Sequence, residues 1–318
     1  MDHYSHCCNR SGNTYFNISP NNYGYNIRKH RCNGIICSLC VCLLHLWQCD
    51  NQKISMKKFS LIIPVYKQEK TIKRDIEAII EALETLSSPF EIISVIDGEF
   101  DRSRFEAEKV KDNRVNVVGY KTNHGKGYAV RYGFAHATGD VIGFMDAGGD
   151  LKASALPLMI NQFLYKQADV IMGSKRHPDS KVVYPWIRKI YSWGYQKIVK
   201  LLFGLDVTDT QVGMKIYRRK LLEDVLPRLL VKQFAFDIEM LAVAYRLGYR
   251  KIFESPVEIS LNMNSSSIIP MKMLPVIYNV LNDTLAVFYR LRILHYYDEG
   301  SKRKWRFDPE LNFRINVG

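Results

Sequence analysis

The stretch FSLIIPVYKQEKTIKRDIEAIIEALETL, from Phe59 to Leu86, contains the two patterns that decide the fold. Its first seven residues form an apolar run up to Val65, interrupted only by Ser60 and Pro64, which is typical of a buried strand. From Thr71 onward the apolar residues recur at helical spacing and predict a helix with one buried face. A strand followed directly by an amphipathic helix is the repeating unit of an α/β protein.

The same alternation of apolar runs and helical patterns continues along the chain. Further strands are predicted at EIISVID, RVNVVGY, DVIGFMD, ADVIMGS, GMKIYRR and KIFESPVEI, and further helices at 125–137, 185–203 and FAFDIEMLAVAYRLGY. This order predicts an α/β fold with a mostly parallel sheet flanked by helices. Ligands of such sheets bind beyond the carboxyl ends of the strands. That rule selects the loops at 66–70, 97–103, 123–126 and 146–150.

Composition divides the chain near residue 56. All 7 cysteines lie in the first 49 residues, which are also rich in Asn, Ser and Tyr and show no amphipathic period. We therefore expect a poorly ordered extension at 1–56, the main domain at 57–262, and a C-terminal helix with a basic tail at 263–318. The cysteine-free remainder needs no disulfides, which fits a reducing compartment.

The extension carries two further patterns. Cys37, Cys40 and Cys42 lie near two histidines, but no second pair completes a zinc site at the usual spacing. The apolar stretch Gly34–Trp47 is similar to the core of a signal peptide. It lacks a clear cleavage site, and it is shorter than the roughly 20 residues that span a bilayer.

The 318-residue chain has a formal net charge of +13, which favours anionic partners. Nucleic acid, phosphorylated substrates and an anionic membrane surface all fit that charge. No nucleic-acid-binding module occurs in the sequence, so we expect no nucleic acid partner. The first strand-to-helix turn lacks the pattern G-x-G-x-x-G, which disfavours an NAD enzyme.

The stretch VIGFMDAGGD, Val141 to Asp150, ends a predicted strand with two carboxylates four residues apart, Asp146 and Asp150. A hard divalent cation needs such oxygens held close together, and a tight turn after a rigid strand supplies them. Gly148 and Gly149 let the backbone turn and leave room for a diphosphate. The pattern predicts a site for a hard divalent cation, and a solvated turn is the alternative.

Two other loops carry groups suited to a nucleotide. Lys126 stands at a predicted helix start, where backbone N–H groups and its ammonium can meet phosphate. Asp97 ends the second strand, where it could accept hydrogen bonds from a ribose or a base. An ordinary loop-to-helix junction and a helix N-cap are the respective alternatives.

Basic residues gather after the strand ADVIMGS. Lys175 and Arg176 follow it directly. Arg188 and Ser192 stand four residues apart on one face of a predicted helix, where they could grip one phosphate. A solvated basic face is the alternative, and the aromatic residues of the same helix also fit a surface that faces lipid.

Together these loops resemble the inverting nucleotide-sugar glycosyltransferases of family two, which have the GT-A fold. The nearest subgroup is the dolichyl- or polyprenyl-phosphate hexosyltransferases. The resemblance covers about residues 59–297 and rests on IIPVYKQEKTI, VIDGEFDRS, NHGKGYAVRYGF, TGDVIGFMDAGGD, MGSKR, DTQVGMKIYRR and FAFDIEML. Each segment alone is weakly specific, but their occurrence in the family's order is a strong signal.

The resemblance implies a donor site with a divalent metal. Pro64, Tyr66 and Asp97 would hold the nucleoside, and Lys126 would lie near the donor. Asp146 would bind the metal, Mg2+ or Mn2+, at the diphosphate.

The resemblance also implies an acceptor site. Lys175, Arg188 and Ser192 match positions that grip the lipid phosphate in this subgroup. Asp209 and Gln211 match a motif that lines the site.

Three positions depart from the family pattern. Gly148 stands at the second acid of the family's DxD motif, whereas Asp150 restores a negative charge, so we expect metal binding through Asp146 and Asp150. Gln68 replaces the usual Glu of the first loop, and Ile96 replaces the first acid of the usual DDGS.

The predicted reaction is direct displacement at the anomeric carbon, which passes a hexose to a polyprenyl phosphate. UDP-glucose is the preferred donor by resemblance, and GDP-mannose is the next. The predicted catalytic residues are Asp146, Lys175, Arg188 and Asp237. A phosphate acceptor is already anionic, whereas a sugar hydroxyl needs a base, for which Asp237 is the candidate. A non-catalytic nucleotide-sugar-binding protein is a further alternative, because one DxD acid is missing.

The predicted location is cytoplasmic, with peripheral attachment to a membrane. The apolar segment Leu274–Tyr297 carries Asp283 and Arg290, which suits an interface better than a bilayer span. The basic run Lys302–Arg306 would add attraction to anionic lipid. A core helix followed by a solvated tail is the alternative.

Overall fold

The computed structural model describes residues 5–8, 15–21, 24–30, 56–182, 186–231, 235–259, 270–300 and 304–316. The chain divides into two compact units, residues 1–54 and 55–318. In the first unit, an antiparallel sheet has the order β1-β2-β3, with β1 (Ser5–Cys8), β2 (Tyr15–Asn21) and β3 (Gly24–His30). The sequence analysis anticipated no strands here, because their apolar residues are sparse. The cysteines of the zinc interpretation at 37, 40 and 42 lie outside the described residues.

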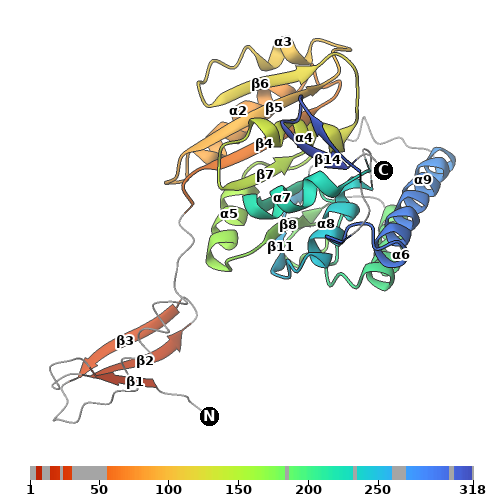
Figure 1. Cartoon of the computed structure of the whole chain (residues 1–318). Helices are drawn as coiled ribbons and strands as arrows, with labels where there is room; N and C mark the ends of the chain where they lie inside the picture. Colours follow the sequence, from red (N-terminus) through yellow and green to blue (C-terminus); the bar gives the residue numbers. More distant parts are fainter. Residues whose placement is uncertain are drawn as a thin grey trace. The chain divides into compact units, whose positions relative to one another are not determined.

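A seven-stranded sheet forms the centre of the second unit, in the order β11-β8-β10-β7-β4-β5-β6 (Figure 1). Its strands are β4 (Phe59–Val65), β5 (Phe90–Asp97), β6 (Val115–Tyr120), β7 (Val141–Met145), β8 (Val170–Ser174), β10 (Met214–Arg218) and β11 (Ile252–Pro256). β4 to β7 run parallel, and β8 is parallel to β11. β10 runs antiparallel to its neighbours β7 and β8. The predicted mostly parallel sheet is confirmed.

Helices cover both faces of this sheet. Leu61 and Ile63 of β4 belong to the core that includes residues of α2 (Ile72–Leu83) and α5 (Ala155–Tyr165). Ile62 belongs to the opposite core, with residues of α4 (Lys126–His136) and α8 (Phe236–Arg246). Successive side chains of a strand point to opposite faces, so one apolar strand supplies both cores. The sequence analysis predicted α2, α4 and α8 but not α5, in which apolar residues occur on nearly all sides.

The remaining elements lie around this layered centre. They are α3 (Ser103–Ala107), β9 (Lys181–Val182), α6 (Trp186–Phe203), α7 (Arg219–Val225), a 3-10 turn (Leu226–Arg228), β12 (Glu258–Ile259), α9 (Pro270–Phe288), a π-helical turn (Tyr289–Ile293), β13 (Trp305–Asp308) and β14 (Phe313–Asn316).

Helices α6 and α9 lie side by side at one end of the unit (Figure 1). The hydroxyl groups of Tyr195 and Thr284 join them by a hydrogen bond of 2.9 Å. No helix in the described part of the chain combines the length and the apolarity needed to span a bilayer.

Candidate active site

The loops after β4, β5 and β7 meet at one edge of the sheet, because these strands are parallel. The start of β10 reaches the same edge, because β10 runs against β7 and pairs Met214 with Met145. Gly213 therefore lies beside Asp146, whose backbone N–H donates to the Gly213 carbonyl at 2.7 Å. A Cβ atom at Gly213 would lie 1.9 Å from Oδ2 of Asp146, so only glycine leaves room for this carboxylate.

Four charged side chains form a continuous chain at this edge, which we call the Lys–Asp cluster: Asp146, Lys126, Asp237 and Lys215. The Nζ atom of Lys126 lies 2.9 Å from Oδ1 of Asp146 and 3.2 Å from Oδ2 of Asp237. The Nζ atom of Lys215 donates to Oδ1 of Asp237 at 2.6 Å and to the Val212 carbonyl at 2.7 Å. Positive and negative charges alternate, and the formal charges of the cluster sum to zero.

Burial makes the charges of the cluster depend on one another. Asp237 is 4% exposed. Burial alone would raise the pKa of its carboxyl, but Lys126 and Lys215 hold that pKa below its ordinary value. Burial opposes the charge of Lys126, yet the two aspartates raise its pKa above the ordinary value. Lys215 is fully buried, and desolvation lowers its pKa. Each ammonium also lies over the ring of Phe144, at 5.4 Å for Lys126 and 5.3 Å for Lys215.

The glycine turn after Asp146 explains one departure from the family pattern. Gly148 has φ +118° and Gly149 has φ +72°, a backbone region that other L-residues rarely adopt. The Gly148 N–H donates to Oδ2 of the buried Asp75 at 2.9 Å, which fixes the turn. An acid at position 148 would strain this turn, and its Cβ atom would lie 3.6 Å from the amide nitrogen of Gln68. The sequence analysis did not identify Asp75, a polar residue on the buried face of α2.

Asp146 suits a divalent cation in its chemistry and its accessibility. Its side chain is 41% exposed, and its two oxygens lie 2.9 and 3.1 Å from the Lys126 ammonium. Asp150, four residues further on, is exposed. Among the described residues, no three His, Cys, Asp or Glu side chains converge as a ready-made metal site.

Asp97 is turned inward, toward the loop that precedes α4. Its carboxylate accepts hydrogen bonds from the Asn123 side chain at 2.8 Å and from the backbone N–H groups of His124 and Gly125 at 2.8 and 3.1 Å. Both oxygens are thus used within the protein. The contacts set the start of α4 and, with it, the position of Lys126.

An aromatic surface lies beyond β4 and β5. Tyr66 is 45% exposed, and its ring lies 6.0 Å from that of Phe100 in an edge-to-face arrangement. The Lys67 ammonium lies over both rings. Pro64 stands within β4, next to Val95 of β5. Phe100 was missed in the sequence, where a single aromatic residue in a polar loop carries no periodic signal.

A second group of polar residues lies beyond β8. The Lys175 ammonium lies 3.5 Å from Oδ2 of Asp209, and the Gln211 N–H donates to Oδ1 of the same residue at 3.2 Å. The Arg176 guanidinium donates to the Ser192 hydroxyl at 3.0 Å. The Arg188 side chain lies outside the described residues, so its predicted proximity to Ser192 stays a prediction. Arg176 is the cation that the structure places beside Ser192.

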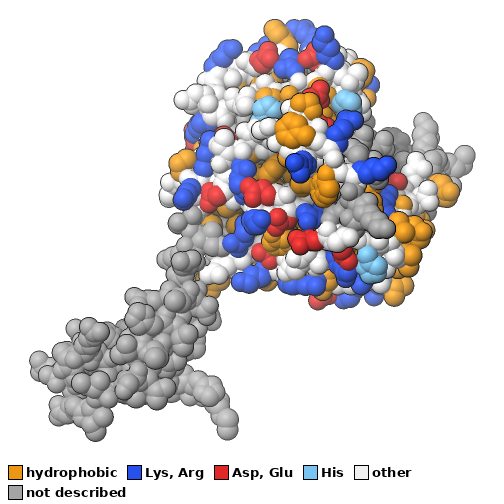
Figure 2. Space-filling model, viewed as in Figure 1, with side chains coloured by type: hydrophobic (Ala, Val, Ile, Leu, Met, Phe, Trp, Pro, Cys, Tyr) orange, Lys and Arg blue, Asp and Glu red, His pale blue; other side chains and the backbone are white. Residues whose placement is uncertain are grey.

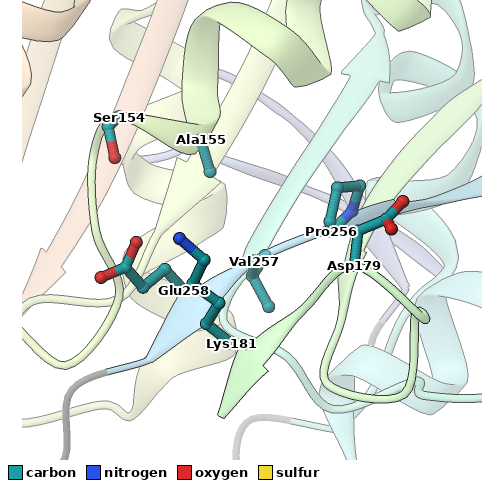
Figure 3. Close-up of a pocket in the computed structure, with 7 residues that line it drawn as sticks. All are labelled: Ser154, Ala155, Asp179, Lys181, Pro256, Val257 and Glu258. Carbon is teal, nitrogen blue, oxygen red and sulfur yellow. The ribbon is translucent and has the colours of Figure 1, made fainter.

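The structure also has a small open hollow of about 160 Å3 (Figure 3). Residues of β9, β12 and the start of α5 line it, including Lys181 and Glu258. It contains none of the predicted site residues. The Lys–Asp cluster is therefore the stronger candidate for the chemistry.

Solved structures share this architecture. Glucosyl-3-phosphoglycerate synthase from Mycobacterium tuberculosis, crystallised with Mn2+, UDP and phosphoglyceric acid, has a TM-score of 0.57 over 82% of this chain and 87% of the synthase. Its sequence is 19% identical, so this likeness concerns the fold, which is the GT-A fold predicted from the sequence.

Sequence comparison gives the family. Glycosyl transferase family 2 matches residues 60–226. Dolichyl-phosphate beta-glucosyltransferase ALG5D of Trichomonas vaginalis is 30% identical over 248 residues, which cover 74% of each chain. The dolichyl-phosphate beta-glucosyltransferase of Homo sapiens is 27% identical over 67% of this chain and 70% of the human protein. The chain belongs to glycosyltransferase family 2, which confirms the resemblance seen in the motifs.

Proposed function

We propose that this glycosyltransferase moves glucose from UDP-glucose to a dolichyl or polyprenyl phosphate, with inversion at the anomeric carbon and with Mg2+ or Mn2+. The two dolichyl-phosphate beta-glucosyltransferases among the relatives support the glucosyl group and the lipid phosphate acceptor. The observation that carries the choice of acceptor is the state of Asp237, whose two oxygens are both engaged by ammonium groups.

A general base must be reachable, and it must accept a proton near neutral pH. Asp237 is buried, and its pKa lies below the ordinary value, because Lys126 and Lys215 outweigh the effect of burial. These properties disfavour Asp237 as a base for a sugar hydroxyl. A phosphate monoester needs no base, since it is anionic already, and it requires mainly positioning.

On the donor side, Asp146 is the proposed metal ligand, with Asp150 as a second carboxylate. Asp146 offers hard carboxylate oxygens on a side chain that is 41% exposed, which fits a Mg2+ or Mn2+ ligand. When bound, the cation would offset the negative charge of the departing diphosphate. Lys126, beside Asp146, is placed to donate to the same diphosphate.

The nucleoside is proposed to lie over the loops after β4 and β5. Tyr66 and Phe100 offer exposed rings against which a uracil can stack, and Pro64 shapes the end of β4. Asp97 would act here through the loop Asn123–Gly125 that it holds, because both of its oxygens are already engaged.

The acceptor phosphate is proposed to bind at Lys175, Arg188 and Ser192. Arg176 is a further candidate, because its guanidinium donates to the Ser192 hydroxyl. A planar guanidinium and a hydroxyl on neighbouring elements suit a tetrahedral phosphate. Asp209, with Gln211 next to it, keeps the Lys175 ammonium in place.

Peripheral attachment to the cytoplasmic face of a membrane would bring the lipid to this site. Large apolar side chains are exposed on α6, α9 and the turn after α9: Trp193, Leu201, Tyr278, Leu285, Tyr289 and Ile293. Hydrophobic side chains gather over these helices at the right-hand edge of Figure 2. The Lys197 ammonium lies 5.4 Å from the Trp193 ring, a pairing of cation and aromatic ring that suits a lipid headgroup region.

The test is transfer by the purified full chain with UDP-glucose, dolichyl phosphate and Mn2+ in detergent. The lipid-linked glucose is extracted and identified by mass spectrometry. We expect Asp146→Asn to reduce transfer by about 10²–10³-fold or more. Asp206→Asn is the matched control, because Asp206 is an exposed acid whose ion-pair partner, Lys200, is also on the surface.

Other outcomes would replace the proposal. A GDP-mannose donor would change the hexose, and transfer to a free sugar hydroxyl would restore a base mechanism. Tight UDP-glucose binding without UDP release would indicate a non-catalytic binder. Asp237→Asn does not separate these cases, because it removes a buried anion from between two ammonium groups and alters the whole cluster.

A further inference from the structure

Lys126 occupies the carboxylate that the proposed metal needs. Its Nζ atom lies 2.9 Å from Oδ1 and 3.1 Å from Oδ2 of Asp146, so one ammonium faces both oxygens. A divalent cation bound to either oxygen would lie close to this ammonium. The two cations therefore compete for Asp146.

The backbone of Lys126 is fixed, whereas its ammonium can pair with either of two carboxylates, Asp146 or Asp237. Asp97 holds the loop up to Gly125, which sets the position of the Lys126 Cα atom. The four-carbon stem of a lysine is flexible, and this side chain is 24% exposed. Asp237 provides a second anion at 3.2 Å, and Lys215 holds Asp237 in place at 2.6 Å. If the Lys126 ammonium moves away from Asp146, Asp237 still neutralises its positive charge.

Charge balance decides when this movement is favourable. The Lys–Asp cluster is neutral as it stands, with two lysines and two aspartates. A divalent cation arriving alone would add two positive charges to a partly buried site beside an ammonium, which is costly. A nucleotide diphosphate brings the missing negative charge, and its oxygens can accept hydrogen bonds from the displaced ammonium.

We propose that Lys126 is a tethered cation that occupies Asp146 in the donor-free protein, so that the metal binds together with the nucleotide diphosphate rather than before it. This inference rests on the proposed metal-dependent function. Beyond that function, the metal would bind only when the nucleotide diphosphate binds, and the Lys126 side chain would be the cause.

The test measures Mn2+ binding rather than activity. Free Mn2+ is titrated by electron paramagnetic resonance against the full chain, with and without UDP. The wild-type protein is expected to bind Mn2+ weakly without UDP and much more tightly with it. Lys126→Met is expected to bind Mn2+ without UDP at least about tenfold more tightly than the wild type, because the competing charge is gone. Lys126→Arg keeps the charge and is expected to resemble the wild type.

Asp146→Asn separates the inference from the proposed function. If this variant loses Mn2+ binding in the presence of UDP while Lys126→Met shows no gain without UDP, the metal site stands and the tethered cation is wrong. If Asp146→Asn binds Mn2+ in the presence of UDP as well as the wild type does, the metal lies elsewhere and both proposals fall. Should Lys126→Met not fold by circular dichroism, the wild type still decides, since equal Mn2+ affinity with and without UDP contradicts the inference.

Discussion

Two buried acids on α8, only two residues apart, are neutralised in different ways. Asp237 belongs to the Lys–Asp cluster, where its partners are the ammonium groups of Lys215 and Lys126. Glu239 accepts hydrogen bonds from the backbone N–H groups of Leu230 and Val231, at 3.0 and 2.8 Å. It also accepts from the Tyr297 hydroxyl at 2.5 Å.

The difference lies in how freely the partners can move. Two donors to Glu239 are N–H groups of the main chain, at Leu230 and Val231, and the third, Tyr297, is fully buried. Glu239 therefore joins that loop to the C-terminal segment as a structural unit. The Lys126 ammonium sits on a flexible stem and can exchange one anion for another. The two acids of α8 thus differ in the kind of group that neutralises them: ammonium groups for Asp237, and mainly backbone N–H groups and a buried hydroxyl for Glu239.

The largest effect on stability is expected at Lys215, the fully buried lysine of the Lys–Asp cluster. Lys215→Met leaves Asp237 buried with one cation fewer, and we expect the free energy of unfolding to fall by about 3–5 kcal/mol. Urea unfolding followed by circular dichroism measures the change. The double variant Lys215→Met with Asp237→Leu removes both charges and should recover much of the loss. A double variant less stable than the single one would show that the ion pair is not the cause.

Gly213→Ala tests whether the chemistry depends on the position of Asp146. The added Cβ atom would lie 1.9 Å from Oδ2 and must displace the carboxylate. We expect kcat/KM for glucosyl transfer to fall by about 10²-fold, the usual result of misplacing a reacting group by 1 Å. Gly194→Ala is the control, because its added Cβ would meet no atom of the described residues outside its own helix within 4 Å. Full activity in Gly213→Ala would mean that Asp146 need not lie where the structure places it.

Tyr297→Phe removes a hydrogen bond to Glu239 and leaves the residues of the Lys–Asp cluster unchanged. Loss of the buried hydrogen bond to Glu239 is expected to lower the free energy of unfolding by about 1.5–3 kcal/mol, as for hydrogen bonds to charged groups. The kcat/KM of the folded variant should stay at the wild-type value. If activity fell while the free energy of unfolding stayed the same, Glu239 would contribute to activity together with Asp237.

Arg290→Met should have the smallest effect of the series. The Arg290 guanidinium lies 3.2 Å from Glu239 but is 23% exposed, and the backbone donors remain. We expect a loss of about 0.5–1 kcal/mol in the free energy of unfolding. A loss larger than that of Tyr297→Phe would make the ion pair, rather than the hydroxyl, the main support of Glu239.

Local patterns predicted most of the central sheet. β4 begins and ends where the run FSLIIPV does, α4 differs from its predicted range by one residue at each end, and α2 differs by one residue at its start and three at its end. The direction of β10 was beyond this reasoning, because its apolar pattern is the same whichever way the strand runs. That direction brings Gly213 to Asp146, a contact with no counterpart in either local sequence.

Only part of the candidate site was predicted, because contacts between distant parts of the chain leave no local signal in the sequence. Asp146, Lys126 and Asp237 were each singled out, and the structure joins them directly. Lys215 was passed over within the strand GMKIYRR, although a lone lysine among apolar strand residues is a usable signal of a buried partner. Asp97 was expected to face the nucleoside, yet its hydrogen-bonding capacity is used by residues 123–125.

The sequence by itself determined the α/β class and the family, because periodic burial and short motifs are properties of neighbouring residues. Only the tertiary structure decided which charges neutralise one another. Lys126 lies 20 residues from Asp146 and 111 from Asp237 along the chain. Ion pairs depend on distance in space, and that distance is set by how the sheet and α8 pack, which no local stretch encodes.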